Sequence, residues 1–163
     1  MTWDAISSLA EVVGAVGVIL SLLYLATQIR HGLTTAADTA TKETIASVVV
    51  QLNAMAEEPN RSSITKGLID YRNLSGDEKV AFDSLTTSLI MIASSSFMSN
   101  KANLLPDELF AGWSGYLQPR FFSYSGAQEW WDESRNIFLP EMQEWVDEEF
   151  SKADNALDFW GIK

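Results

Sequence analysis

The sequence predicts an all-α protein in which a single N-terminal transmembrane helix is followed by a small helical bundle. Two observations lead to this fold class. The segment from Val12 to Ile29 holds 18 residues without a charge. The residues after it repeat their apolar positions at helical spacing and show no strand-like alternation of apolar and polar residues. We therefore expect a transmembrane anchor in residues 1–32 and an acidic helical domain in residues 33–163.

The charge-free segment is long enough to cross a bilayer. At about 1.5 Å per residue, a helix of this length spans roughly 27 Å, close to the hydrocarbon core of a membrane. A cleavable signal peptide is one alternative, but such a peptide begins with basic residues, and here Asp4 and Glu11 precede the segment without any Lys or Arg. A buried core helix of a soluble protein is the other, because the segment is near the lower length limit of a span.

Small residues share one side of this predicted helix. Ala10, Gly14, Gly17 and Ser21 recur at i, i+4, i+7 and i+11, which places them on one stripe. Lipid gives helices no hydrophobic reason to associate, so small side chains promote packing by letting two backbones approach closely. The stripe predicts a helix–helix interface. The alternative is that Gly and Ala are simply common in membrane helices.

Basic residues flank the predicted span on one side only. Arg30 follows it directly and Lys42 lies a little further on, whereas the N-terminal flank has no basic residue. Positively charged flanks stay in the cytoplasm, so we expect the C-terminal domain there. The chain has no cysteine, which excludes a disulfide scaffold and fits the cytoplasm without separating the two sides.

Further helices are predicted from periodicity and from start signals. Ser75 and Glu78 form a capping box, in which each side chain satisfies a free backbone N–H of the first turn. Pro106 is followed by Asp107 and Glu108, acids that complement the start of a helix dipole. The expected ranges are residues 35–57, 62–71, 75–101, 106–122, 126–136 and 140–152.

A second uncharged stretch extends from Ser84 to Asn100. It is rich in serine, and its apolar residues follow a helical stripe that begins at Phe82 and Leu85. This pattern is typical of an amphipathic helix that buries one face in a core. A second membrane span is the alternative.

Aromatic residues are concentrated in the C-terminal region. Trp130, Phe138 and Trp145 are spaced to line one side of consecutive helices, and we expect them in the core because large rings bury much apolar area. Aromatic residues outside that line are candidates for contact with a partner, since exposed Trp and Phe are enriched in interface hot spots. These candidates are Trp131, Phe159 and Trp160.

The charge balance restricts the partners. The chain carries a net charge of −11. From Glu129 onward it has ten acidic residues and three basic ones, Arg135, Lys152 and Lys163. Nucleic acids and anionic headgroups are bound by Lys and Arg that replace counterions. We therefore expect no nucleic-acid partner. The acids form either a solvated helical face or a surface for a basic protein.

The sequence offers no catalytic constellation. His31 is the only histidine, which excludes an HExxH zinc site and a Ser/His/Asp triad, and the lack of cysteine excludes thiolate chemistry. No glycine-rich phosphate loop has the required spacing. We predict no catalytic residue, no cofactor site, no metal site and no enzymatic activity. His31 is read as an interfacial residue, with ligation of a haem or pigment of a neighbouring complex as the alternative.

The run AEVVGAVGVILSLLYLATQIRHG, residues 10–32, resembles the N-terminal anchor of a large group of uncharacterised bacterial membrane proteins, common in proteobacteria. Its usual form there is close to AEIVGAIAVVISLIYLAVQIRQN. Residues 73–82, 104–113 and 126–148 resemble the group's recurring helical phrases, whereas SLIMIASSSFMSN at residues 88–100 departs from it. The resemblance implies a single-span protein of the bacterial inner membrane and a helical domain, and it implies no activity.

These observations predict a membrane-anchored structural or interaction protein. Its partners would be membrane lipid and either further copies of the chain or a larger bacterial membrane complex with a respiratory, photosynthetic or transport role. The alternative is a small membrane-tethered enzyme or sensor with a pocket between its helices. The absence of histidine and cysteine motifs favours the first function over the second.

Overall fold

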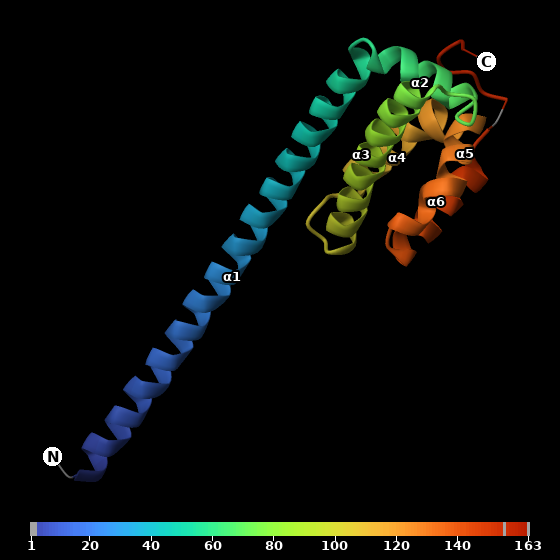
Figure 1. Cartoon of the computed structure of the whole chain (residues 1–163). Helices are drawn as coiled ribbons and strands as arrows, with labels where there is room; N and C mark the ends of the chain where they lie inside the picture. Colours follow the sequence, from blue (N-terminus) through green and yellow to red (C-terminus); the bar gives the residue numbers. More distant parts are fainter. Residues whose placement is uncertain (1–2, 155, 163) are drawn as a thin grey trace. The chain divides into compact units, whose positions relative to one another are not determined.

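The computed structural model describes residues 3–154 and 156–162 (Figure 1). It confirms the predicted all-α class, because the described residues form helices and loops without a β-strand. The chain folds into two compact units, Met1–Thr39 and Ala40–Lys163. We describe each unit by itself.

The first helix, α1, runs from Trp3 to Ala56 without a break. A separate helix beginning near residue 35 was the expectation, and this is wrong. Gly32 lowers helix propensity by about 1 kcal/mol relative to alanine, but no proline blocks the helical path there. The hydroxyls of Thr34 and Thr35 instead donate to the carbonyls of Arg30 and His31 at 3.1 and 3.0 Å, inside the continuing helix.

The second helix, α2, spans Asn60–Ile69 and lies beside α3, Gly76–Lys101, and α5, Ser125–Ser134 (Figure 1). Glycines allow this close packing. A Cβ atom on Gly67 would lie 2.1 Å from the Phe82 ring, and a Cβ atom on Gly126 would lie 1.9 Å from the carbonyl oxygen of Gly67. Both distances are far below van der Waals contact, so α2 packs against the Phe82 ring of α3, and α5 against the backbone of α2, only because these two residues lack side chains.

The start of α3 confirms the predicted capping box. The backbone N–H of Ser75 donates to Oε2 of Glu78 at 3.1 Å, and the reciprocal bond to the Ser75 side chain is present. Phe82, Leu89 and Ile90 of this helix are buried in the core. The helix also has the length and composition of a membrane span, but its apolar stripe packs against the domain as the amphipathic pattern predicted.

The region after α3 contains two irregular helical segments. The helix expected over residues 106–122 is divided into α4, Asp107–Leu117, and a π-helix η1, Gln118–Phe122. Pro119 lacks a backbone N–H, which favours this change of hydrogen-bond pattern. The helix α5 is followed by a 3₁₀ turn, η2, Arg135–Ile137. The last helix, α6, spans Pro140–Lys152, as predicted.

The core of the second unit is rich in aromatic rings. Trp130, Phe138 and Trp145 are buried, as predicted, and the indole N–H of Trp130 donates to Asp83 at 2.8 Å. A buried carboxylate, Glu149, joins α6 to α4 and η1 by accepting hydrogen bonds from the side chains of Ser114 and Gln118. Further hydrogen bonds attach the end of α1 to α3.

Candidate functional site

The N-terminal part of α1 is apolar on every side. All described side chains from residue 10 to residue 36 are exposed, and Val12, Leu20 and Leu22 each expose about 60% of their surface. The helix segment Ala10–Ala56 contains a window long and apolar enough to cross a membrane, and no part of that window is buried. Signal sequences near an N-terminus share this length and composition.

The backbone along the small-residue stripe is accessible to another helix. A Cβ atom built on Gly14 or Gly17 would meet no atom within 4 Å. The hydroxyl of Ser21 donates to the carbonyl of Gly17 at 2.8 Å, so it is satisfied inside its own helix. Ala10 is exposed as well. The stripe is therefore accessible, and its role as a helix–helix interface stays a prediction.

The structure corrects one of the three aromatic residues expected at a partner surface. Trp131 is 1% exposed, and its indole N–H donates to Asp147 at 2.7 Å. The Trp131 ring lies 6.1 Å from that of Trp130 and 5.3 Å from that of Phe138, measured between ring centres, so it belongs to the core and not to a partner surface. Phe159 and Trp160 are 43% and 50% exposed.

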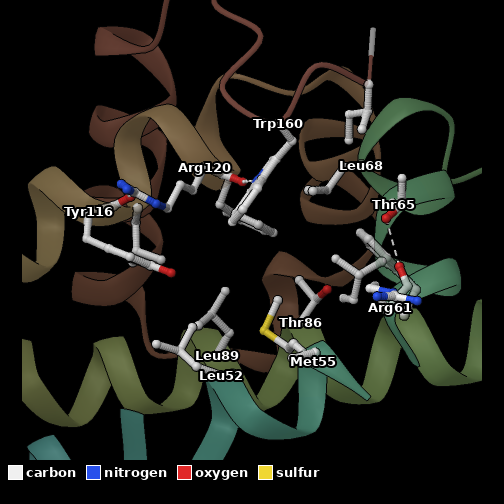
Figure 2. A pocket seen from close by; sticks show the side chains of 16 residues that line it. Leu52, Met55, Arg61, Thr65, Leu68, Thr86, Leu89, Tyr116, Arg120 and Trp160 are labelled. Atoms are coloured by element: carbon white, nitrogen blue, oxygen red, sulfur yellow. Dashed lines mark hydrogen bonds between the residues drawn. The ribbon is translucent and has the colours of Figure 1, made fainter. Parts of the chain in front are cut away.

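A cavity of about 420 Å³ opens inside the second unit, between the end of α1, α2, α3, the α4–η1 region and the residues after α6. Figure 2 shows Leu52, Met55 and Leu89 on one side of this space and Leu68 and Trp160 on the other. Its volume lies in the range of roughly 300–1,000 Å³ that is typical of small-molecule sites, which are also mainly apolar.

The charged groups of the cavity are all basic. Arg61 and Arg120 line it, whereas none of the described acidic residues does. Arg61 pairs with Glu58 at 2.7 Å. Arg120 has no carboxylate within ion-pair distance among the described residues. Its guanidinium lies 4.2 Å from the centre of the Tyr116 ring and 3.8 Å from that of Phe159, which holds the cation over two aromatic faces.

Three residues of the lining carry hydroxyl groups, Thr65, Thr86 and Tyr116, and the Thr65 hydroxyl donates to the carbonyl of Arg61 at 2.8 Å. Figure 2 shows the Tyr116 hydroxyl directed into the space beside Leu89, and this hydroxyl makes no hydrogen bond to another described side chain. The hydroxyl of Thr86 is buried and also lacks a partner among the described residues. A buried hydroxyl without a partner costs about 1–3 kcal/mol. Among the lining residues, Thr86 therefore has a buried hydroxyl that the described part of the domain does not satisfy.

The π-helix η1 positions the basic end of the cavity. It brings Arg120 and Phe121 to the cavity wall while Phe122 enters the core. The Ser123 hydroxyl donates to the carbonyl of Gln118 at 2.9 Å, which links the residue after η1 to the first residue of this segment. Such π segments are often found at functional sites.

The residues after α6 form one wall of the cavity, through Trp160 and Ile162. The backbone N–H of Trp160 donates to the Tyr124 hydroxyl at 2.9 Å, and its indole N–H donates to the carbonyl of Arg120 at 3.1 Å. The Tyr124 hydroxyl donates to Asp158 at 3.2 Å, and the same carboxylate oxygen accepts the backbone N–H of Ile162 at 2.9 Å. These bonds fix the tail against the domain.

Sequence reasoning did not find this cavity, because its walls come from segments far apart in the chain. Pro119 inside a predicted helix was the one local signal near it. Among residues 3–154 and 156–162, no three His, Asp or Glu side chains come together to hold a metal ion. No protein-family model, curated protein or solved structure matches this chain.

Proposed function

We propose that this chain is a membrane-anchored interaction protein, in which residues 12–29 cross the bilayer and residues 33–163 form the domain outside it. The observation that carries the proposal is the exposure of large apolar side chains all around the N-terminal part of α1. A helix that is apolar on every side requires either a protein core or lipid. The described residues supply no cover for it, and lipid would.

The proposed location and orientation depend on residues next to the span. The resemblance of residues 10–32 to a proteobacterial anchor supports a bacterial inner membrane. Arg30 and Lys42 follow the span, and cytoplasmic flanks carry an excess of such residues. We therefore place the C-terminal domain in the cytoplasm.

The proposed partners follow from the stripe and from the charge. Ala10, Gly14, Gly17 and Ser21 would contact a second transmembrane helix, from another copy of the chain or from a subunit of a larger respiratory, photosynthetic or transport complex. Phe159 and Trp160, both about half exposed, are the aromatic candidates for contact outside the membrane. The net charge of −11 disfavours nucleic acid.

A role without catalysis is part of this proposal, since the chain has a single histidine and no cysteine. A second candidate function, a membrane-tethered sensor with a pocket between its helices, is favoured by one specific observation. This observation is the cavity of about 420 Å³ with basic groups in its lining. The two functions are compatible, because the cavity and the anchor use different residues.

Membrane fractionation tests the anchor. We expect the full chain to stay with membranes during an alkaline wash and to be released by detergent, and its intact mass should include residues 1–32. In the control, lysines replace Val16 and Leu20, which costs about 2.5–3.5 kcal/mol per residue at the centre of a span and should move the chain to the soluble fraction. A wild-type chain that is soluble without detergent, or a mature chain that has lost residues 1–32, would contradict the proposal.

Cysteine labelling tests the orientation, because the chain has no cysteine of its own. A cysteine at exposed Ala156 should resist an impermeant thiol reagent in intact cells and react after lysis. A cysteine in place of exposed Trp3 is the matched control and should react in intact cells. The reverse pattern would place the domain on the outer side.

A further inference from the structure

We propose that the cavity of the helical domain binds the anion of a single-chain amphiphile, a long-chain fatty acid, with its carboxylate at Arg120 and Tyr116. This inference rests on the second candidate function, a tethered sensor with a pocket, and names its ligand. It does not depend on the membrane anchor.

The shape and lining of the cavity favour a long apolar chain. Leucine, methionine, isoleucine and phenylalanine side chains form most of the wall. Transfer of methylene groups from water to such a wall gains roughly 0.8 kcal/mol for each group. Two other cavities, of about 470 and 320 Å³, are lined mainly by polar side chains. Because this apolar cavity measures only about 420 Å³, a one-chain amphiphile fits better than a diacyl lipid.

The charge of the lining favours an anionic head. The chain has twice as many acidic as basic residues, 22 against 11, yet both charged residues at the cavity are arginines. Of these, Arg61 is neutralised by Glu58, whereas Arg120 has no such partner among the described residues. Arg120 would repel a cationic head. An anionic head would instead form an ion pair with Arg120.

The geometry at Arg120 favours a carboxylate in particular. The Tyr116 and Phe159 rings hold the guanidinium from two directions, and its Nη1 donates to the Tyr116 carbonyl at 3.2 Å, so little side-chain freedom remains to be lost on binding. A guanidinium presents a planar fork of donors that matches a carboxylate. The Tyr116 hydroxyl, directed into the cavity, supplies a further donor to the same head (Figure 2).

Photo-crosslinking on the full chain in lipid nanodiscs tests the proposal. The probe is stearate that carries a diazirine in its chain, and adducts are located by peptide mass spectrometry. We expect adducts on the cavity wall, at residues such as Met55, Ile64 and Leu89. Excess oleate should abolish them, and oleylamine, which has the same chain with a cationic head, should not. Phosphatidylglycerol with a diazirine in one chain serves as the diacyl arm and should leave the cavity unlabelled.

Variants separate the cavity from the surrounding lipid. Arg120→Gln should reduce cavity adducts roughly ten- to a hundredfold, as expected for a lost hydrogen bond to a charged group, and Arg120→Lys should retain the preference for oleate. Leu89→Trp should fill the cavity and abolish its adducts. Arg72→Gln is the matched control, since Arg72 is exposed and outside the cavity. Circular dichroism checks that each variant is folded.

The outcomes are decisive in either direction. Cavity adducts that oleate removes and Arg120→Gln weakens would establish the site. Adducts confined to residues 10–29 would show that the fatty acid follows the bilayer and would overturn the proposal. Equal competition by oleate and oleylamine would overturn the anionic head, and cavity labelling by the diacyl probe would overturn the single-chain ligand. None of these results depends on which side of the membrane holds the domain.

Discussion

At the scale of single residues, the domain depends on two glycines that leave room for backbone contact. The carbonyl oxygen of Gly67 occupies the position where a side chain of Gly126 would begin. This contact sets the distance between α2 and α5, and Gly67 in turn touches the Phe82 ring of α3. The packing of α2 against α3 and α5 therefore leaves no room for a side chain at either glycine.

We predict that Gly126→Ala destabilises the domain by at least about 1–3 kcal/mol, the usual cost of overpacking, because the new methyl group meets backbone atoms that cannot rotate away. Gly115→Ala is the matched control. It lies inside α4 with nothing within 4 Å of an added Cβ, so it should raise stability by about 0.5–1 kcal/mol. Thermal unfolding followed by circular dichroism measures both, and a stable Gly126→Ala variant would refute the close contact.

Glu78 makes the stability of the domain depend on acid pH. The ion pair with Lys66, together with hydrogen bonds from Ser75, lowers the pKa of Glu78 from 4.5 to about 2. The folded state therefore binds this proton more weakly than the unfolded state. The stabilising contribution is complete above the ordinary pKa and is lost as the pH falls from about 4.5 to about 2.

We predict that Glu78→Gln lowers the melting temperature above about pH 4.5 and that its difference from the wild type shrinks toward about pH 2. Glutamine can still accept the backbone N–H of Ser75, so the substitution removes the charge and keeps the cap. Melting curves over this pH range measure the effect. A difference that stays constant with pH would mean that the carboxylate contributes through packing alone.

At the scale of elements, the sequence predicted helices well where strong local signals mark their ends. The Ser75 capping box and Pro140 placed two helix starts correctly, because each side chain acts within one turn. Gly32 and the threonines after it are weaker signals, and α1 continues through them. The π-helix η1 was not predicted, because its hydrogen-bond pattern depends on the packing of Phe121 and Phe122 as well as on Pro119.

The small-residue stripe of α1 leads to a prediction about assembly. Changing Gly14 and Gly17 to leucine should leave membrane insertion intact, because leucine is favourable in lipid, and should abolish association, because larger side chains keep two helices apart. Val16→Leu, away from the stripe, is the control and should keep the native assembly. The mass of the particle in mild detergent measures the outcome. A double variant with the native mass would direct attention to Phe159 and Trp160 instead.

At the scale of the whole molecule, the two units differ in how much of their apolar surface is exposed. Exposed apolar side chains characterise residues 10–36, whereas the second unit has its own buried core. Gln51 ties the end of α1 to α3 by donating to the carbonyl of Leu85 at 2.7 Å and accepting the Ser88 hydroxyl at 2.9 Å. The second unit therefore includes the last turns of α1.

We predict that deletion of residues 1–32 leaves a soluble helical domain that unfolds cooperatively. Its core contacts lie after residue 40, so the deletion removes apolar surface without opening the core. Gel filtration without detergent and circular dichroism measure the result. A further deletion through Gln51 is the contrasting variant and should unfold the domain. Aggregation of the shorter deletion would mean that the anchor also shields part of the domain.

Fold class and core were readable from sequence at this scale, but the cavity was not. Periodicity assigns Leu52 and Leu89 to the apolar sides of their helices, yet it cannot say whether opposing side chains fill the space between them. Trp131 illustrates the same limit, because its burial involves contacts with Phe138 and Asp147, which come later in the chain. Such features arise from the meeting of distant segments, which a local pattern does not describe.

The way in which the residues after α6 are attached affects the rate of ligand exchange. Trp160 closes the cavity with only a few hydrogen bonds, one of them from its indole N–H to Arg120, so the wall can open without unfolding the core. The rate at which any occupant enters or leaves would then be set by this opening and not by the strength of its contacts. Hydrogen exchange at the Trp160 indole N–H measures the free energy of this opening, and it can be measured while the cavity is empty.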